Sequence, residues 1–360
     1  MDFLPRLRRS HRLALLTIGA CALSYLNTSD FYDQRRLSSI FEGPTRNLGS
    51  PSGNEGRQEN ENENKCPDII SKMKGIYKNP SDDPSKKFEN VILVTAASSG
   101  FEDYLRNWEM HADDFNLKWL TVAFDKDLYN SRDGAERNLL ISNDNQEKEK
   151  QDFGAKGYYK LVCNKMRIVL EILESCDIDV MFSDTDIALM QDPFKHELGN
   201  KIASGQFDYI FQHNMNKGGS VPGEHPCMKG SMPGEGNTGF HYMKPTTEVK
   251  NLIKKTLTMC EAEDIDDQTA FWKVMSNSTD EWTYCSTHTS STTNYAPRKE
   301  GKNQYCCLDP YYYTVAFEKP EPAHIDDIVM FHSNWAAGNN KKWKLKTWLK
   351  DGWRLPLNYN

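Results

Sequence analysis

Two aspartates separated by one residue, Asp184 and Asp186, directly follow a short, largely apolar run at 178–183. Alternate residues of an extended backbone point the same way, so the two carboxylates can converge on one cation. Oxygen ligands suit Mg²⁺ or Mn²⁺, and such ions usually complete their coordination with substrate phosphates. An Asp-x-Asp pair on its own is more often a helix cap or a solvated turn. The strand-like run before this pair favours a metal site that holds a diphosphate.

The segments around the aspartates alternate between two hydrophobic patterns. A continuous apolar run at 91–97 predicts a buried strand, and runs at 119–124 and 178–183 predict two more. Apolar side chains at helical spacing predict one helix over 101–108 and another over 158–173. Strands that alternate with helices predict an α/β fold with a mostly parallel sheet covered on both faces. Ligands of such sheets bind beyond the carboxyl ends of the strands, where the aspartate pair falls.

Residues 1–87 have the composition of a targeting segment followed by a spacer. An arginine-rich start at 1–12 precedes an uncharged apolar stretch at 13–26. As a helix this stretch spans about 21 Å, against about 27 Å of hydrocarbon in thin early-secretory membranes. We expect a signal-anchor with its N-terminal tail in the cytosol, and a cleaved signal peptide is the alternative. Residues 27–87 predict a flexible lumenal stem, and residues 88–360 predict one folded domain.

Cysteine usage and charge agree with the secretory route. Nine cysteines are present, and without Cys21 an even number remains, which suits disulfides in an oxidising lumen. No Cys-x-x-Cys pair supports a structural zinc site. We expect the adjacent Cys306 and Cys307 to pair with different partners, because a bond between neighbours strains the peptide. Residues 277–279 form a glycosylation sequon expected on the surface. A net charge of -7 without a long basic run excludes electrostatic capture of nucleic acid.

The run MFSDTDIALMQDPF, which contains both aspartates, resembles the nucleotide-diphospho-sugar transferase family that includes plant cell-wall arabinosyl- and xylosyltransferases. Further segments resemble the family in its order: 91–108, 122–129, the helix before the aspartates, 237–246, 266–272 and 331–343. The resemblance implies a GT-A fold, which is an α/β, Rossmann-like, mostly parallel mixed sheet with helices on both faces. It also implies a metal-dependent glycosyltransferase that retains anomeric configuration and moves a sugar from a UDP-sugar to a glycan or glycoprotein acceptor. With the signal-anchor, we expect a single-pass type II protein of the Golgi membrane, or a secreted protein if the leader is cleaved.

The resemblance also implies a metal-ligand set. It makes Asp186 a direct ligand, gives Asp184 contact with the metal shell or the donor ribose, and matches His332 to the third ligand. An imidazole beside carboxylates favours Mn²⁺, with Mg²⁺ as the alternative. A lone histidine is otherwise more often buried and satisfied by hydrogen bonds. Gly338 and Lys341 would then approach the donor diphosphate, although adjacent lysines are also typical of a solvated helix face.

Other residues match donor positions near the nucleobase and ribose. Thr95 and Ala96 lie on the first predicted strand, and Asp125 ends the second. Small residues there let a planar base lie against the edge of the sheet. Ordinary packing at the end of a strand is nearly as good an explanation for each residue alone.

Two further segments match acceptor and catalytic positions. Asn237, Thr238 and Gly239 would line the acceptor side, although this tripeptide is also typical of a plain turn. Asp267 and Gln268 would lie beneath the anomeric carbon of the donor sugar, where the Gln268 amide oxygen could stabilise a cationic sugar. A helix N-cap is the competing use for an aspartate at this place.

Other classes of protein fit the sequence less well. A haloacid dehalogenase-like phosphatase also carries Asp-x-Asp after a strand, but usually has Thr or Val where this chain has Ala188. The dinucleotide-binding fingerprint and the P-loop are both absent from the sequence. The remaining alternative is a lumenal protein that binds a sugar nucleotide or glycan without turnover, as a degenerate transferase would.

Overall fold

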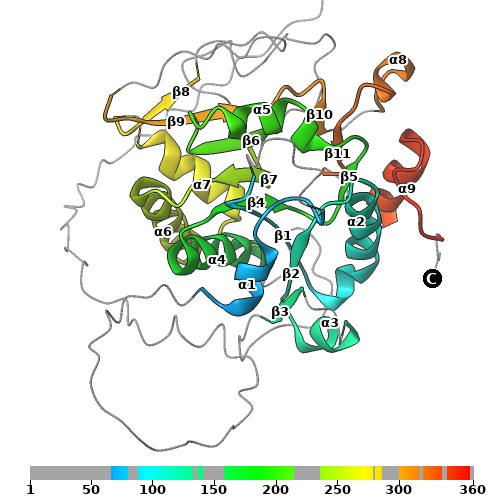
Figure 1. Cartoon of the computed structure of the whole chain (residues 1–360), viewed down its shortest axis with the longest axis horizontal. Helices are drawn as coiled ribbons and strands as arrows, with labels where there is room; N and C mark the ends of the chain where they lie inside the picture. Colours follow the sequence, from blue (N-terminus) through cyan, green and yellow to red (C-terminus); the bar gives the residue numbers. More distant parts are fainter. Residues whose placement is uncertain are drawn as a thin grey trace, which may run out of the picture.

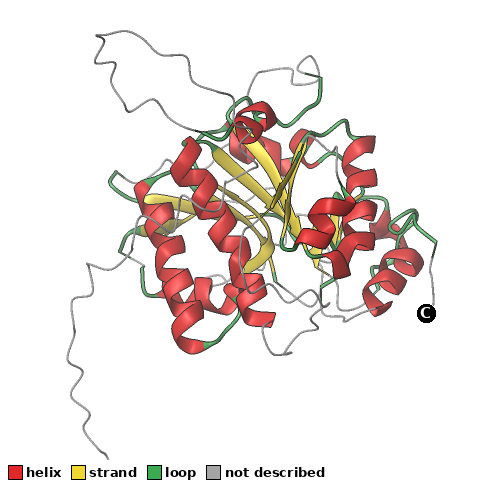
Figure 2. Cartoon of the chain, turned by 90° about the horizontal axis from the view of Figure 1, so that it is seen from below, coloured by secondary structure: helices red, strands yellow, loops and turns green. Residues whose placement is uncertain are grey.

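The computed structural model describes residues 66–79, 88–132, 137–140, 158–214, 236–278, 280–285, 300–315, 319–334 and 339–356. A mixed sheet with helices on both sides forms the centre of this part of the chain (Figures 1 and 2). The predicted signal-anchor at 13–26 lies outside the described residues. Within them, no helix combines the length and apolar character needed to cross a bilayer.

Eight strands form the main sheet in the order β3-β2-β1-β4-β7-β6-β9-β8. Their bounds are β1 Val91–Ala97, β2 Trp119–Ala123, β3 Asn138–Leu140, β4 Asp179–Ser183, β6 Tyr209–His213, β7 Gly236–Met243, β8 Trp282–Tyr284 and β9 Asn303–Cys307. Strand β7 runs antiparallel to both of its neighbours, β4 and β6, and the other pairs are parallel. This arrangement confirms the predicted α/β class with a mostly parallel mixed sheet.

A smaller sheet packs beside the main one, with the order β10-β11-β5. Its strands are β10 Tyr313–Val315, β11 Met330–His332 and β5 Ile187–Leu189. His332 is the last residue of β11. Strand β5 starts at Ile187, the residue that follows Asp186, so the Asp-x-Asp pair lies in the connection between the two sheets.

The helices cover the main sheet from both sides (Figure 2). The helical elements are α1 Asp68–Met73, η3 Ser99–Phe101, α2 Glu102–Asp114, α3 Lys126–Ser131, α4 Tyr158–Cys176, η4 Pro193–Lys195, α5 Glu197–Ala203, α6 Thr247–Glu263, α7 Asp267–Ser276, α8 Pro322–Ile325 and α9 Asn339–Trp348. Helices α1, α4, α6 and α7 share one hydrophobic cluster with one face of the sheet. Helices α2 and α5 and the smaller sheet share the cluster on the opposite face.

Strand β1 illustrates why the strands are apolar throughout. Ile92 and Val94 pack in the cluster of α4 and α6, whereas Val91 and Leu93 pack in the cluster of α2. Successive strand residues point to opposite faces, so a strand with helices on both sides needs an uninterrupted apolar run. The sequence pattern at 91–97 reflects this double burial.

The folded part begins earlier in the chain than the predicted boundary at Phe88. Ile70 of α1 is buried in the main core, and Ile76 and Tyr77 are buried on the other face of the sheet. A disulfide joins Cys66 to Cys176 at the end of α4. The predicted stem at 27–87 therefore contains, at 66–79, a segment that packs on the domain. Its few apolar residues lie among polar ones, which is why composition alone did not reveal it.

Two more disulfides brace the described part of the chain. Cys163 of α4 bonds Cys260 of α6, and Cys285 bonds Cys306 of β9. The adjacent Cys306 and Cys307 do not bond each other, as predicted. Cross-links of this kind stabilise a fold chiefly by restricting the unfolded chain.

Candidate metal centre and active site

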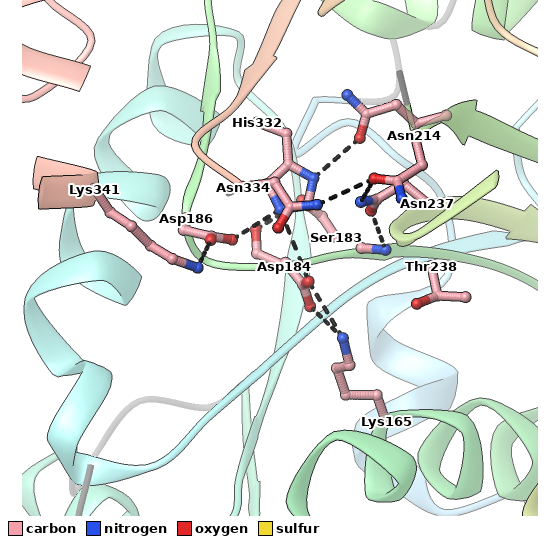
Figure 3. Close-up of polar contacts among 12 residues, drawn as sticks. Lys165, Ser183, Asp184, Asp186, Asn214, Asn237, Thr238, His332, Asn334 and Lys341 are labelled. Carbon is pink, nitrogen blue, oxygen red and sulfur yellow. Dashed lines mark hydrogen bonds and ion pairs between the residues drawn. The ribbon is translucent and has the colours of Figure 1, made fainter. Parts of the chain in front are cut away.

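Three side chains from both sheets meet at the carboxyl end of β4. Asp184 directly follows β4, Asp186 directly precedes β5, and His332 ends β11. Because β11 pairs antiparallel with β5, His332 lies opposite Ile187, the residue after Asp186. One ligand atom from each of the three lies within 4.8 Å of the other two (Figure 3). The structure therefore brings together the three residues predicted to hold a metal ion.

The distances within this group fit a divalent ion. His332 Nε2 lies 3.1 Å from Asp186 Oδ1 and 4.0 Å from Asp184 Oδ2. Around an octahedral ion with ligands about 2.1 Å away, adjacent ligand atoms lie about 3 Å apart and opposite ones about 4.2 Å. Small side-chain adjustments would bring all three atoms into one shell. Two carboxylates and an imidazole are compatible with Mn²⁺ or Mg²⁺.

Each of the two aspartates also faces a lysine (Figure 3). Lys341 of α9 donates to Asp186 Oδ2. Lys165 of α4 lies 3.2 Å from both carboxylate oxygens of Asp184 and 3.3 Å from Asp267 Oδ2. Lys341 was predicted near the donor diphosphate, whereas Lys165 was not predicted at all. On the sequence, Lys165 is one polar residue in an amphipathic helix, and only the tertiary fold reveals that it joins two carboxylates.

The charges of this group shift its protonation equilibria. Burial alone would raise the pKa of Asp186, but Lys341 and His332 outweigh it and hold that pKa well below its ordinary value. Burial alone would lower the pKa of Lys165, but Asp184 and Asp267 outweigh it and raise that pKa. Lys165 therefore stays protonated and Asp186 stays ionised at neutral pH. Burial raises the pKa of the third carboxyl, Asp267, although Lys165 opposes the shift.

Gly239 lies against the candidate metal ligands. A Cβ atom at this position would come within 2.5 Å of Asp184 Oδ2 and of His332 Cε1. The pairing of β6 and β7 is irregular here, since Phe211 pairs with His241 while the next residue, Gln212, pairs with Asn237. Such an irregularity bends a strand and re-aims its side chains. Gly239 thus lies inside β7 beside the metal-ligand group, rather than in a turn.

The two aspartates before α7 have different roles. Asp266 is the N-cap of α7, because its carboxylate accepts from the backbone N–H of Thr269 at 2.8 Å. Asp267 points the other way, and its Oδ2 accepts from Thr238 Oγ1 at 2.9 Å as well as facing Lys165. Gln268 follows on α7 and is half-buried. In the described part of the chain, no hydrogen bond connects Gln268 to the metal-ligand group.

Three asparagines gather on the other side of the metal-ligand group (Figure 3). Asn237 Oδ1 accepts from the backbone N–H of Gly239 at 2.7 Å. Asn237 Nδ2 and Asn334 Nδ2 both approach Asn214 Oδ1, at 3.4 and 3.3 Å. Asn214 lies directly after β6 and was missed in the sequence, where a single asparagine after a strand gives no signal. These amides fix the path of the backbone around Gly239.

The predicted donor residues lie on the neighbouring strands. Thr95 of β1 pairs with Ser183, the last residue of β4, and its buried Oγ1 has no hydrogen-bond partner among the described residues. Ala96 is buried beside it. Asp125 is the N-cap of α3: its two oxygens accept from the backbone N–H groups of Leu128 and Ser99, at 2.8 and 2.7 Å. Gly338 lies outside the described residues.

Fold and site together define an α/β protein with a candidate divalent-metal centre at the carboxyl edge of its main sheet. The model of the nucleotide-diphospho-sugar transferase family matches residues 116–345, and the chain belongs to that family. This membership confirms the resemblance found in the sequence and agrees with the predicted GT-A fold class.

The chain also matches individual proteins, at low sequence identity. The chain is 27% identical over 171 residues to a UDP-D-xylose:L-fucose alpha-1,3-D-xylosyltransferase of Arabidopsis thaliana, over 46% of this chain and 45% of that protein. It is 25% identical over 190 residues to the Arabidopsis thaliana enzyme of the same description called MGP4, over 48% of each. The chain thus spans about half the length of the curated relatives it matches. The crystal structure of the glycosyltransferase GlyE in Streptococcus pneumoniae TIGR4 aligns with 72% of this chain and 57% of that chain, at 11% identity and a TM-score of 0.40.

Proposed function

We propose that this protein is a metal-dependent glycosyltransferase that moves a sugar from a nucleotide diphosphate, with UDP as the nucleotide, to a glycan or glycoprotein acceptor and retains the anomeric configuration. The observation that carries the proposal is the convergence of Asp184, Asp186 and His332 at the carboxyl end of β4, in a member of the nucleotide-diphospho-sugar transferase family. Ligands of open α/β sheets bind at this edge.

The charge arrangement supports a role in diphosphate departure. A divalent ion bound by Asp184, Asp186 and His332 would neutralise the negative charge that develops on the departing diphosphate. Lys341, which contacts Asp186, adds a permanent positive charge on the same side. Lys165 bridges Asp184 and Asp267 and offsets part of their negative charge.

We assign the donor sugar and the acceptor to the side of the metal-ligand group that faces away from Lys341. Asp267 and Gln268, at the start of α7, are proposed to lie beneath the anomeric carbon, where Thr238 and Lys165 hold the Asp267 carboxylate. Asn237, Thr238 and Gly239 are proposed to face the acceptor. Thr95 and Ala96, on β1, are proposed to face the nucleoside. Both oxygens of Asp125 accept backbone N–H bonds, so its proposed contribution to donor binding is to hold the loop after β1 in place.

The test is transfer by the purified full chain. The names of the Arabidopsis relatives make UDP-xylose with an L-fucose acceptor the first pair to try, followed by UDP-galactose, UDP-arabinose and UDP-glucose. Turnover with Mn²⁺ is expected, together with loss of turnover after chelation and recovery on adding Mn²⁺ or Mg²⁺. Full activity of chelated, metal-free protein would refute metal dependence. Binding of a UDP-sugar with neither transfer nor hydrolysis would favour the non-catalytic alternative.

We also propose that the protein is a single-pass type II protein of the Golgi membrane, with its folded domain in the lumen. The support is the leader at 1–26 together with three disulfides, which are typical of an oxidising compartment. Asn277 of the sequon is exposed at the end of α7, at the opposite end of this helix from Asp267. Expression in secretory cells should yield a glycan on Asn277 that PNGase F removes and Asn277→Gln abolishes. A chain without glycan that stays in the cytosol would contradict this localisation.

A further inference from the structure

Gln212 links the candidate metal centre to both sheets. It belongs to β6 of the main sheet, and its side chain is fully buried. It lies at the irregularity in the pairing of β6 with β7. From there its amide reaches the smaller sheet, where it contacts the backbone of Tyr313 on β10 and the ring of His332 on β11. Because the side chain of Gln212 is uncharged, its effect on the site depends on the direction of its hydrogen bonds.

The surroundings of Gln212 fix which way its amide points. Nε2 lies 3.2 Å from the carbonyl oxygen of Tyr313 and 3.6 Å from Met330 Sδ. A carbonyl oxygen only accepts hydrogen bonds, so the NH₂ group of Gln212 must be on this side. A flipped amide would place two acceptor oxygens against each other. The carbonyl Oε1 of Gln212 must therefore face His332.

The orientation of the amide fixes a proton on one nitrogen of the histidine. Gln212 Oε1 lies 3.1 Å from His332 Nδ1, and an acceptor at this place requires that Nδ1 carry a proton. The other nitrogen, Nε2, lies 3.1 Å from Asp186 Oδ1 and 4.0 Å from Asp184 Oδ2. Without an ion, Nε2 donates to the Asp186 carboxylate. A metal ion bound there would take the place of the Nε2 proton, and the proton held on Nδ1 leaves Nε2 as the ligating nitrogen.

We propose that Gln212 is a positioning residue that keeps a proton on His332 Nδ1 and aims its Nε2 at the metal site. The inference rests on the proposed function for the role of the ion, but the hydrogen bond from His332 Nδ1–H to Gln212 Oε1 is a property of the chain alone. Partners that donate to or accept from the second nitrogen of a ligating histidine usually contribute 10–100-fold to metal affinity. The hydrogen-bond chain from Tyr313 through Gln212 to His332 supplies such a partner.

The experiment uses three variants of the full chain. Gln212→Met keeps the length of the side chain and removes both hydrogen bonds. Gln212→Glu keeps an acceptor toward Nδ1 but loses the NH₂ group that donates to the Tyr313 carbonyl, so it separates the two hydrogen bonds. Gln304→Met makes the same change at a buried glutamine of β9, which pairs with β6 but has no contact with His332 among the described residues. Thermal unfolding of each variant reports whether the fold is kept.

Two measurements are made without donor or acceptor. Titration of Mn²⁺, followed by electron paramagnetic resonance of the free ion, is expected to yield a 10–100-fold weaker affinity for Gln212→Met, and a change of less than about threefold for Gln212→Glu and Gln304→Met. Nitrogen-15 NMR of labelled histidines, with the His332 signal identified by its loss in His332→Gln, is expected to reveal protonated Nδ1 in the wild type and in Gln212→Glu. In Gln212→Met, loss of the Nδ1 proton is expected, because only the Asp186 carboxylate, at Nε2, then accepts from the ring.

The outcomes separate this inference from the proposed function. Unchanged Mn²⁺ affinity and an unchanged Nδ1–H signal of His332 in a folded Gln212→Met would overturn the role of Gln212. If Gln212→Met does not fold, Gln212→Glu decides: loss of the Nδ1–H signal there refutes the role, and its retention supports it. A wild type that binds no Mn²⁺ but carries a proton on His332 Nδ1 would refute the metal centre and leave the positioning by Gln212 intact.

Discussion

The two ends of strand β4 both carry aspartates, and their surroundings differ. At the start of the strand, Asp179 accepts a hydrogen bond from the hydroxyl of Tyr242. Asp208 is close by and fully buried, and its carboxylate accepts from the backbone N–H of Gln304 at 2.9 Å. Burial raises the pKa of Asp179. At this end, each carboxylate accepts a hydrogen bond from a neutral donor of the fold, and Lys244 adds a positive charge near Asp179.

At the carboxyl end of β4, the carboxylates have charged partners from separate elements. Asp184 faces Lys165 of α4, and Asp186 faces Lys341 of α9 and His332 of β11. Convergence of like charges from several elements is unfavourable unless a cation compensates them. The fold places acidic pairs at both ends of β4. An acidic pair therefore indicates a metal site only when side chains from several other elements converge on it.

The largest effect on turnover is expected from a substitution at the carboxyl end of β4. Asp186→Asn keeps the shape of the side chain and removes the charge that a metal ion would need. Turnover is expected to fall at least about 100-fold, which corresponds to about 2.7 kcal/mol of transition-state stabilisation. Initial rates with a UDP-sugar and Mn²⁺, together with Mn²⁺ affinity, provide the measurement.

The matched control is the same substitution at the other end of β4. Asp179→Asn is expected to lower the melting temperature, because its hydrogen bond with Tyr242 weakens, and to leave the turnover of the folded protein within about twofold. The comparison fails if Asp179→Asn abolishes turnover of folded protein, or if Asp186→Asn retains it.

A smaller effect is expected from the glycine beside the metal-ligand group. In Gly239→Ala, the new methyl group would meet the carboxylate of Asp184 and the ring of His332, so both ligands must move. Shifts of this size at a metal site are expected to weaken Mn²⁺ binding about 10-fold, which a titration of the metal alone measures. Gly205→Ala is the control: its position has a positive φ of 68° and no neighbouring atom within 4 Å of the added methyl. That change should lower stability only, and equal losses of Mn²⁺ affinity in both variants would contradict the steric argument.

The sequence predicted three strands of the main sheet and the metal-ligand group, and the reasons are a local pattern or a motif. Strands at 91–97 and 178–183 are buried on both faces, so their apolar runs are unmistakable. Asp184 and Asp186 follow a strand directly, and His332 was found through the family resemblance. These features depend on neighbours along the chain or on a motif.

The partners of those residues depend on contacts between distant segments. Lys165 is 19 residues before Asp184 and far from Asp267 in sequence, so its pairing with both arises only when α4 packs beside α7. For Gly239 a turn was left open as the alternative, because a short polar tripeptide gives the same signal in a turn and in an irregular strand. Gln212 gives no signal, since a single glutamine in an apolar run does not reveal which way its amide points.

The smallest effect concerns the same helix, α4, away from the site. Glu171 is buried, and its Oε1 has no hydrogen-bond partner among the described residues. Burial raises the pKa of Glu171 to about 8, although Arg167 opposes the shift, and Glu174 adds to it. Between its ordinary value of about 4.5 and about 8, the unfolded chain releases this proton while the folded chain keeps it, so stability falls as pH rises through this window.

Glu171→Gln removes that dependence, because a neutral amide fills the same volume at every pH. The variant is expected to match the wild type near pH 4.5 and to melt a few degrees higher at pH 8, with turnover unchanged. Melting temperatures from pH 4.5 to 8 measure the effect. Glu174→Gln is the control, since the Glu174 carboxylate pairs with Lys254 at 2.6 Å at the surface and its removal should not flatten the curve. A Glu171→Gln curve parallel to that of the wild type would mean that Glu171 is ionised in the folded protein. The interior of α4 would then tolerate a buried charge, whereas at the carboxyl end of β4 lysines compensate the carboxylates.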